Sequence, residues 1–206
     1  MLFKETKLKG AYIIELEPVE DQRGYFARSF CRNEFKLHGI SMEVVQCNIS
    51  YNKKKGTLRG MHFQVPPSEE AKIVSCSKGA IYDVIIDLRP DSPTYCKWLG
   101  VELSANRSPL TAHRSLLTAH RSLLTAHPSP LAGSCRMLYV PRGFAHGFLT
   151  LEDDTELFYL MSEFYSPGHG RGIRWNDPFF GITWPGEVKV VSDQDRSYPD
   201  FTFNKT

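Results

Sequence analysis

Short runs of β-branched and aromatic residues recur along the chain, each bounded by turn-forming residues. They follow one another about every ten residues, and apolar positions within them often alternate with polar ones. Alternation with a period of two separates the two faces of a strand. The runs are AYIIELEP, RGYFARSF, EVVQCNIS, GTLRGMHFQ, AKIVSCSKGAIYDVIIDLRP, KWLGVELS, RMLYVPRGFAHGFLTL and ELFYLMSEFY. This density of strands predicts an all-β sandwich or barrel of antiparallel strands with few helices.

Two short segments carry more specific predictions. In KIVSCSKGAIYDVIIDL the apolar positions alternate on both sides of Lys78 and Gly79, which indicates a hairpin with glycine in its turn. The segment CRNEFKLHG, from Cys31 to Gly39, predicts a short helix that Asn33 caps and that Gly39 ends.

A repeat interrupts the strand pattern in the stretch SPLTAHRSLLTAHRSLLTAHPSP. Ser108 and Pro109 are typical of a helix start and Pro128 of a helix end, so a helix of about eighteen residues is predicted between them. The leucines of the repeat would form one apolar stripe on that helix. We interpret the stretch, within residues 107–135, as an insertion between two strands of the main fold.

The histidines of this repeat, His113, His120 and His127, do not form a plausible metal site. Neighbours seven residues apart on a helix are separated by roughly 10.5 Å. Zinc ligands stand at about 2 Å from the metal, so one ion cannot bind all three from a straight helix.

Composition limits the class of protein. With 206 residues and 41% hydrophobic residues, the chain can bury one substantial core, and a single domain over residues 1–206 is predicted. The net charge of +2, without a long basic run, does not favour binding to nucleic acid or membranes. No apolar stretch has the length of a signal peptide or a membrane span. The five cysteines are scattered and lack a Cys-x-x-Cys pair, which favours free thiols in the cytoplasm.

Candidate chemistry comes from polar residues embedded in the strand segments. Arg59 and His62 lie in TLRGMHFQ, and Lys72 opens the next predicted strand. Residues three apart on a regular strand point to opposite faces, so Arg59 and His62 share a face only if Gly60 introduces a bulge. Neither the paired histidines of a metal-binding barrel, nor a G-x-S-x-G elbow, nor a glycine-rich phosphate loop is present.

Several segments together resemble one known family. DQRGYFARSF, QCNIS, GTLRGMHFQVPP, AKIVSCSKGAIYDVIIDLRPDSPTYCKWLGVELSA, LYVPRGFAHGFLTL and RGIRWNDP are similar, in order, to signature segments of the dTDP-4-dehydrorhamnose 3,5-epimerases. The resemblance runs from about Asp21 to Asp195 and is interrupted by the repeat. It implies a cupin-type double-stranded β-helix, or jelly roll, a homodimer, a nucleotide-sugar substrate, and no metal or redox cofactor.

The resemblance also implies a proton-transfer site. The C3 and C5 protons of a 4-keto-6-deoxy sugar are acidified by the ketone, so inversion needs a base on one face and an acid on the other. His62 matches the family's base, and Asp195, or alternatively Asp193, matches the carboxylate that orients its ring. Lys72 would stabilise the enolate oxygen, and Tyr159 matches the proton donor.

Further matched positions imply substrate contacts. Tyr165 corresponds to an aromatic residue that stacks on the thymine ring. Arg28 stands where relatives commonly have Glu, and Gly170 stands where a polar contact is common. The resemblance therefore leaves open which nucleotide base and which sugar the substrate carries. The substrate-binding positions that the resemblance implies are Arg23, Arg28 and Arg59 near the nucleotide and diphosphate, Gln46 and Asn48 as polar contacts, His146 on the sugar or phosphate, and Tyr165 on the base.

These matches predict an epimerase that converts dTDP-4-keto-6-deoxyglucose into dTDP-4-keto-rhamnose through an enolate. A single-carbon epimerase on another nucleotide-linked keto sugar is one alternative. A catalytically silent protein that binds nucleotide sugars is a second, and a metal-dependent cupin enzyme is a third.

Overall fold

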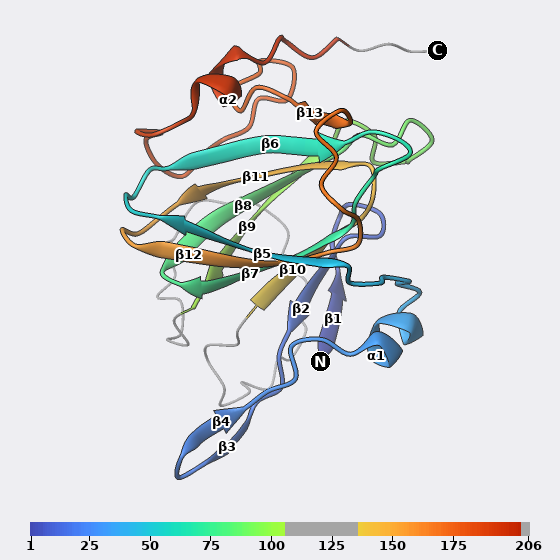
Figure 1. Ribbon diagram of the computed structural model, residues 1–206, viewed down its shortest axis with the longest axis vertical. Coiled ribbons are helices and arrows are strands. Elements are labelled where there is room, and N and C mark those ends of the chain that lie inside the picture. The colour runs from blue at the N-terminus through green and yellow to red at the C-terminus, as the bar shows by residue number, and fades with distance from the viewer. Residues whose placement is uncertain (106–135, 203–206) are drawn as a thin grey trace, which may run out of the picture.

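Two antiparallel β-sheets face each other in the computed structural model, which describes residues 1–105 and 136–202 (Figure 1). One sheet has six strands in the order β1 (Leu2–Glu5), β2 (Tyr12–Glu15), β10 (Arg136–Val140), β7 (Lys72–Lys78), β12 (Thr155–Met161) and β5 (Gln46–Asn52). The other has five strands in the order β13 (Gly170–Gly172), β6 (Leu58–Gln64), β11 (Phe144–Thr150), β8 (Ala80–Asp87) and β9 (Trp98–Ser104). The predicted all-β jelly roll is confirmed.

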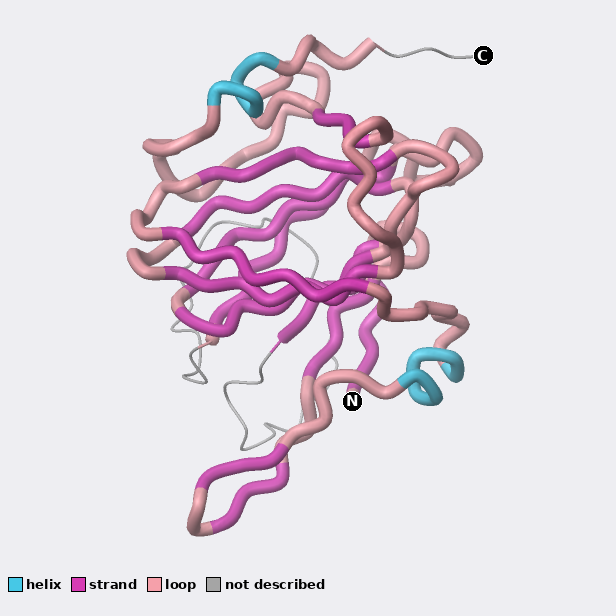
Figure 2. The backbone as a smooth tube through the Cα atoms, viewed as in Figure 1, coloured by secondary structure: helices cyan, strands magenta, loops and turns pink. Residues whose placement is uncertain are grey.

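Strands β3 (Val19–Asp21) and β4 (Gly24–Phe26) pair only with each other in the described structure, and they form a hairpin that projects from the body (Figures 1 and 2). The two described helices are short: α1 (Arg32–Leu37) and α2 (Asp193–Ser197). We call the β3–β4 hairpin the arm.

The predicted helix after the arm exists, but its N-terminal cap differs from the prediction. Cys31 is the N-cap residue and makes no side-chain capping bond, whereas Asn33 lies inside α1. Gly39 adopts a φ of 73°, the left-handed conformation that commonly ends a helix, and its N–H donates to the carbonyl of Lys36. The predicted role of Gly39 is therefore confirmed, and that of Asn33 was wrong.

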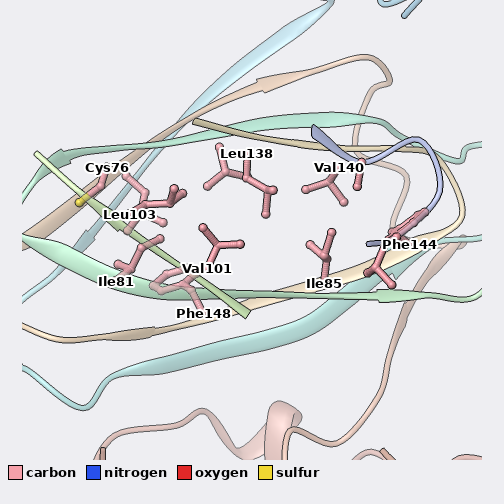
Figure 3. Close-up of a cluster of buried hydrophobic side chains, with 13 residues drawn as sticks. Cys76, Ile81, Ile85, Val101, Leu103, Leu138, Val140, Phe144 and Phe148 are labelled. Atoms are coloured by element: carbon pink, nitrogen blue, oxygen red, sulfur yellow. The ribbon is translucent and has the colours of Figure 1, made fainter. Parts of the chain in front are cut away.

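The main core lies between the two sheets (Figure 3). Two smaller apolar clusters cover the outer faces, one beneath α1 on the six-stranded sheet and one beneath the C-terminal segment on the five-stranded sheet. Strand β8 shows how the sequence produces this layering. Ile81 and Ile85 face the main core, whereas Val84 and Ile86 face the outer cluster, so the run is apolar on both faces.

Lys78 and Gly79 do not form the predicted hairpin, because β7 and β8 belong to different sheets. Strand β7 pairs with β10 and β12, and β8 pairs with β11 and β9. Gly79 has a φ of 78°, and a Cβ there would lie 2.5 Å from Oγ1 of Thr155. Glycine thus lets the chain turn tightly from β7 in one sheet to β8 in the other. The alternation of apolar and polar residues is the same on either side of a hairpin turn, so it cannot distinguish the two arrangements.

The repeat falls outside the described residues, together with its predicted helix, its three histidines and Cys135. The four described cysteines, Cys31, Cys47, Cys76 and Cys96, are free thiols. Within the described ranges, no helix is long and apolar enough to cross a membrane.

Candidate active site

A cleft lies between β5, β7 and β12 of the six-stranded sheet and β6 and β11 of the other. It comprises two adjoining cavities of about 650 and 510 Å³. These volumes fall in the range of small-molecule sites. Both cavities share five lining residues, namely Asn48, His62, Lys72, Met161 and Gln194.

A bulge in β6 brings Arg59 and His62 into the same cavity. His62 is opposite His146 on β11, but Arg59 is opposite Phe148, so the register shifts between them. Gly60 has a φ of 125°, and a Cβ on it would lie 2.5 Å from the Cα of Gly147. The close approach of two glycine backbones therefore makes room for the bulge, which is the condition under which Arg59 and His62 could share a face.

His62 pairs with Asp195. Nε2 of His62 lies 2.6 Å from Oδ1 of Asp195, and the backbone N–H of Gly60 donates to the other carboxylate oxygen at 3.2 Å. Asp195 is held in α2, where its own N–H donates to the capping hydroxyl of Ser192. Asp195 is buried whereas Asp193 is exposed, so the structure selects Asp195 as the partner of His62.

The Asp195 carboxylate is set to remain ionised beside the imidazole. Burial by itself would raise its pKa, but hydrogen bonds from His62 and Gly60 and the attraction of His62 hold the pKa below its ordinary value. A carboxylate on Nε2 favours the tautomer that carries its proton there. The other ring nitrogen, Nδ1, then carries the lone pair that can accept a proton.

Lys72 begins β7 and is buried at the junction of the two cavities. Its ammonium lies 2.9 Å from Oε1 of Glu70, and both side chains are more than nine-tenths buried. The second oxygen of Glu70 is buried without a hydrogen-bond partner in the described structure. Glu70 thus compensates the buried cation and fixes its position.

A second histidine–carboxylate pair lies deeper in the cleft. Nε2 of His146 is 2.6 Å from Oδ1 of Asp83, and both residues are buried. The ring of Tyr159 packs edge-on against His146 with centroids 6.1 Å apart. Burial raises the pKa of Tyr159, and the nearby charge of Asp83 raises it further, so the phenol stays protonated at neutral pH.

Polar side chains of β5 form hydrogen bonds with residues of both cavities. Arg59 donates from Nε to Oδ1 of Asn52 at 2.8 Å, which orients its guanidinium on the cavity wall. Gln46 donates to Oδ1 of Asn48 at 3.1 Å and accepts a hydrogen bond from the N–H of Tyr165 at 3.3 Å. The ring of Tyr165 is largely exposed at this end of the cleft.

Two implied substrate residues lie away from the cleft. Arg23 is at the tip of the arm and pairs with Asp21, and Arg28 follows the arm and lies 2.9 Å from Glu34. Neither side chain lines the cleft. The remaining implied residues do: Arg59, His62, Lys72, His146, Asn48, Tyr159 and Asp195 line the first cavity, and Gln46 and Tyr165 line the second.

Sequence reasoning missed Glu70, Asp83, Gln194 and Tyr198. Asp83 carried a usable signal, because it is a charged residue within the apolar run AIYDVIID. Tyr198 packs edge-on against His62 with centroids 6.3 Å apart, and Gln194 donates to its hydroxyl at 2.9 Å. Both belong to the C-terminal segment, whose return to β6 no local pattern predicts.

No group of three or more histidine, cysteine or acidic side chains in residues 1–105 and 136–202 is arranged to hold a metal ion.

Comparisons of the sequence with known proteins agree on one family. A sequence model described as dTDP-4-dehydrorhamnose 3,5-epimerase matches residues 5–114 and 131–202, with a gap inside the repeat. A dTDP-4-dehydrorhamnose 3,5-epimerase of Sinorhizobium fredii is 36% identical over 97% of this chain and 89% of its own length.

Solved structures extend the agreement to three dimensions. The dTDP-4-dehydrorhamnose 3,5-epimerase of Bacillus anthracis with TDP and PPi bound superposes with a TM-score of 0.80, at 36% identity over 97% of this chain and 99% of that chain. A 3'-monoepimerase from Streptomyces bikiniensis in complex with dTDP-quinovose gives a TM-score of 0.74, at 29% identity over 95% of this chain and 85% of that chain.

The fold, the cleft and these matches define an isomerase of the kind that acts on nucleotide sugars. The chain belongs to the dTDP-4-dehydrorhamnose 3,5-epimerase family.

Proposed function

We propose that this chain inverts C3 and C5 of dTDP-4-keto-6-deoxyglucose to give dTDP-4-keto-rhamnose. The observation that carries the proposal is the convergence of His62, Lys72 and Tyr159 on one cavity, with Asp195 behind His62. This set supplies a base, a cation for an enolate oxygen and an acid. Family membership supports the substrate class.

Each inversion is two proton transfers through an enolate. Nδ1 of His62 removes the proton from the carbon beside the ketone, and the electron pair of the broken C–H bond moves into the C4 carbonyl. The ammonium of Lys72 stabilises the negative charge that develops on the C4 oxygen. Tyr159 then gives its proton to the opposite face of the carbon, and the carbonyl re-forms. No electrons are gained or lost overall, so the reaction requires no redox cofactor.

The two proton-transfer groups come from opposite walls of the cleft. His62 lies on β6 of the five-stranded sheet and Tyr159 on β12 of the six-stranded sheet. A sugar ring held between the sheets would therefore present one face to each group. The raised pKa of Tyr159 supports its role as the acid, because the phenol carries its proton at neutral pH.

Deuterium exchange tests the function. In D₂O, the wild-type protein should incorporate deuterium at C3 and C5 of dTDP-4-keto-6-deoxyglucose, and NMR should show the product with both centres inverted. A folded protein that binds dTDP but exchanges neither carbon would contradict the proposal.

Inversion of one carbon is the second candidate function. The structural match to a 3'-monoepimerase favours it, and the same cleft could serve both reactions. The exchange experiment separates the two, because a single-carbon enzyme would label and invert only C3 or only C5.

We further propose that the protein is a homodimer in which the arm reaches the partner. The arm and the segment after it carry Arg23 and Arg28, which the resemblance implies as substrate contacts, yet neither side chain lines the cleft of its own chain. Val19, Tyr25 and Phe26 on the arm are 71%, 52% and 76% exposed. Covering these apolar side chains with a second copy would bury them and bring Arg23 to a substrate.

Strand β5 offers a surface for that copy. It is one of the two edge strands of the six-stranded sheet, so among residues 1–105 and 136–202 no strand pairs with the outer side of its backbone. Together with β12 it exposes an apolar patch made of Ile49, Tyr51 and Phe158.

The free thiols of the four described cysteines support a cytoplasmic location, which we also propose.

A further inference from the structure

A buried glutamine lies directly behind the loop that carries Tyr165. Gln64 ends β6 and is only 6% exposed, whereas Tyr165 is 67% exposed on the segment between β12 and β13. An aromatic ring so exposed has little packing to hold it. The position of its backbone must therefore come from hydrogen bonds.

The amide of Gln64 bonds the chain on both sides of Tyr165. Its Nε2 donates to the carbonyl of Phe164 at 3.1 Å, and its Oε1 accepts from the N–H of Ser166 at 2.6 Å. The second hydrogen on Nε2 is donated to the carbonyl of Ser68 at 2.8 Å. The buried amide therefore uses both of its donors and its acceptor, and a buried polar group satisfied in this way holds a single arrangement.

Neighbouring bonds hold the same loop from further sides. Gln46 on β5 accepts from the N–H of Tyr165 itself, so the loop is bonded to both sheets. Nδ1 of His169 lies 2.7 Å from the hydroxyl of Ser166. Gln64 is the most buried side chain of this set, and its two bonds are those that bracket Tyr165.

Gln64 also links Tyr165 to the proton-transfer chemistry. It lies two residues after His62 on β6, so the two side chains leave the same face of one strand. Through Gln64, the loop that carries Tyr165 is thus bonded to the strand that carries His62.

We propose that Gln64 is a positioning residue that holds Tyr165 as the stacking surface for the nucleotide base. The inference rests on the proposed function, in which Tyr165 contacts the base. It predicts that the loss of Gln64 weakens the binding of the base while leaving proton transfer intact.

The test uses Gln64→Met, which keeps the length and approximate volume of the side chain but removes its hydrogen bonds. The dissociation constant of dTDP should rise roughly tenfold, within the range that stacking of a base on an aromatic ring supplies. KM for the sugar nucleotide should rise similarly, with kcat within about twofold of wild type. Binding of pyrophosphate, which has no base, should not change.

Thr155→Val is the control for a general loss of stability. Thr155 is fully buried and donates from its hydroxyl to the carbonyl of Glu152, at the end of β12 that is roughly 20 Å from Met161 by strand rise. This variant should lower the melting temperature without raising the dissociation constant of dTDP.

The double variant Gln64→Met, Tyr165→Ala decides between positioning and an independent effect. If Gln64 acts through Tyr165, the double variant binds dTDP no more weakly than Tyr165→Ala alone. The inference is overturned if Gln64→Met leaves dTDP binding unchanged, if the two effects multiply, or if Tyr165→Ala has no effect. Failure of the proposed function would instead appear as absence of deuterium exchange in the wild-type protein.

Discussion

His62 and Tyr159 line one cavity from strands of two different sheets. Each is supported by a carboxylate from a distant part of the sequence: Asp195 bonds His62 directly, and Asp83 bonds the histidine against which Tyr159 packs. This arrangement can place a base and an acid on opposite faces of a ring, which is what inversion at a carbon requires.

Replacing Asp195 by Asn should lower kcat about 10- to 100-fold, because the imidazole loses the carboxylate that fixes its tautomer and orientation. The fold should persist, since the amide oxygen of Asn can still accept from the N–H of Gly60. Steady-state kinetics on the purified variant provide the measurement. The matched control is Asp193→Asn on the exposed side of α2, and an equal loss of kcat in that control would refute the assignment.

Gly60→Ala should destabilise the protein by about 2 kcal/mol or more, because the new Cβ would meet the Cα of Gly147 at 2.5 Å and because φ is 125°. Chemical denaturation measures the change, and any folded fraction should have weak activity, since the bulge positions Arg59 and His62. Gly168→Ala is the control: nothing lies within 4 Å of its Cβ position. Similar stability losses in both variants would show that the close approach at the bulge is not tight.

Asp87→Asn should change stability in a pH-dependent way. Burial by itself would raise the pKa of Asp87, but hydrogen bonds from Arg89, Ser92 and Thr94 lower the pKa below its ordinary value of 3.8. A lowered pKa in the folded state stabilises the protein above pH 3.8, and this contribution is lost as the pH falls through the folded-state pKa. The difference in unfolding free energy between wild type and variant should therefore be largest near neutral pH and shrink below about pH 4. A difference that stays constant down to pH 3 would contradict this origin.

Co-expression of two inactive variants should test the dimeric site. If the arm acts on the partner, Arg23→Ala and His62→Asn together form heterodimers in which one site has an intact His62 and receives an intact Arg23. Tagged heterodimers should then recover activity that neither homodimer has. If Arg23 acts within its own protomer, or not at all, the mixture should show no activity beyond that of the two variants measured separately.

Apolar alternation along the chain was sufficient to predict the strand content, and the resemblance to a family was sufficient to predict most of the residues that the structure gathers in the cleft. The sequence pattern led to a wrong prediction at Lys78 and Gly79. Apolar and polar residues alternate there as in a hairpin, but the chain crosses from one sheet to the other. The sequence did not decide whether Asp193 or Asp195 pairs with His62. Only the folded structure distinguishes them, because Asp195 lies on the buried side of α2 and Asp193 on its exposed side. Glu70 was missed because its importance comes from a buried ion pair, which depends on the closed cleft.

The roles of His62 and Tyr159 are separated by following exchange and inversion independently in D₂O for His62→Asn and Tyr159→Phe. Tyr159→Phe keeps the base, so it should still exchange the proton at C3 or C5 with solvent, while inversion falls about 100-fold or more because no acid serves the opposite face. His62→Asn should lose both exchange and inversion. Inversion at the wild-type rate in Tyr159→Phe, or undiminished exchange in His62→Asn, would contradict the roles of acid and base proposed for these two residues.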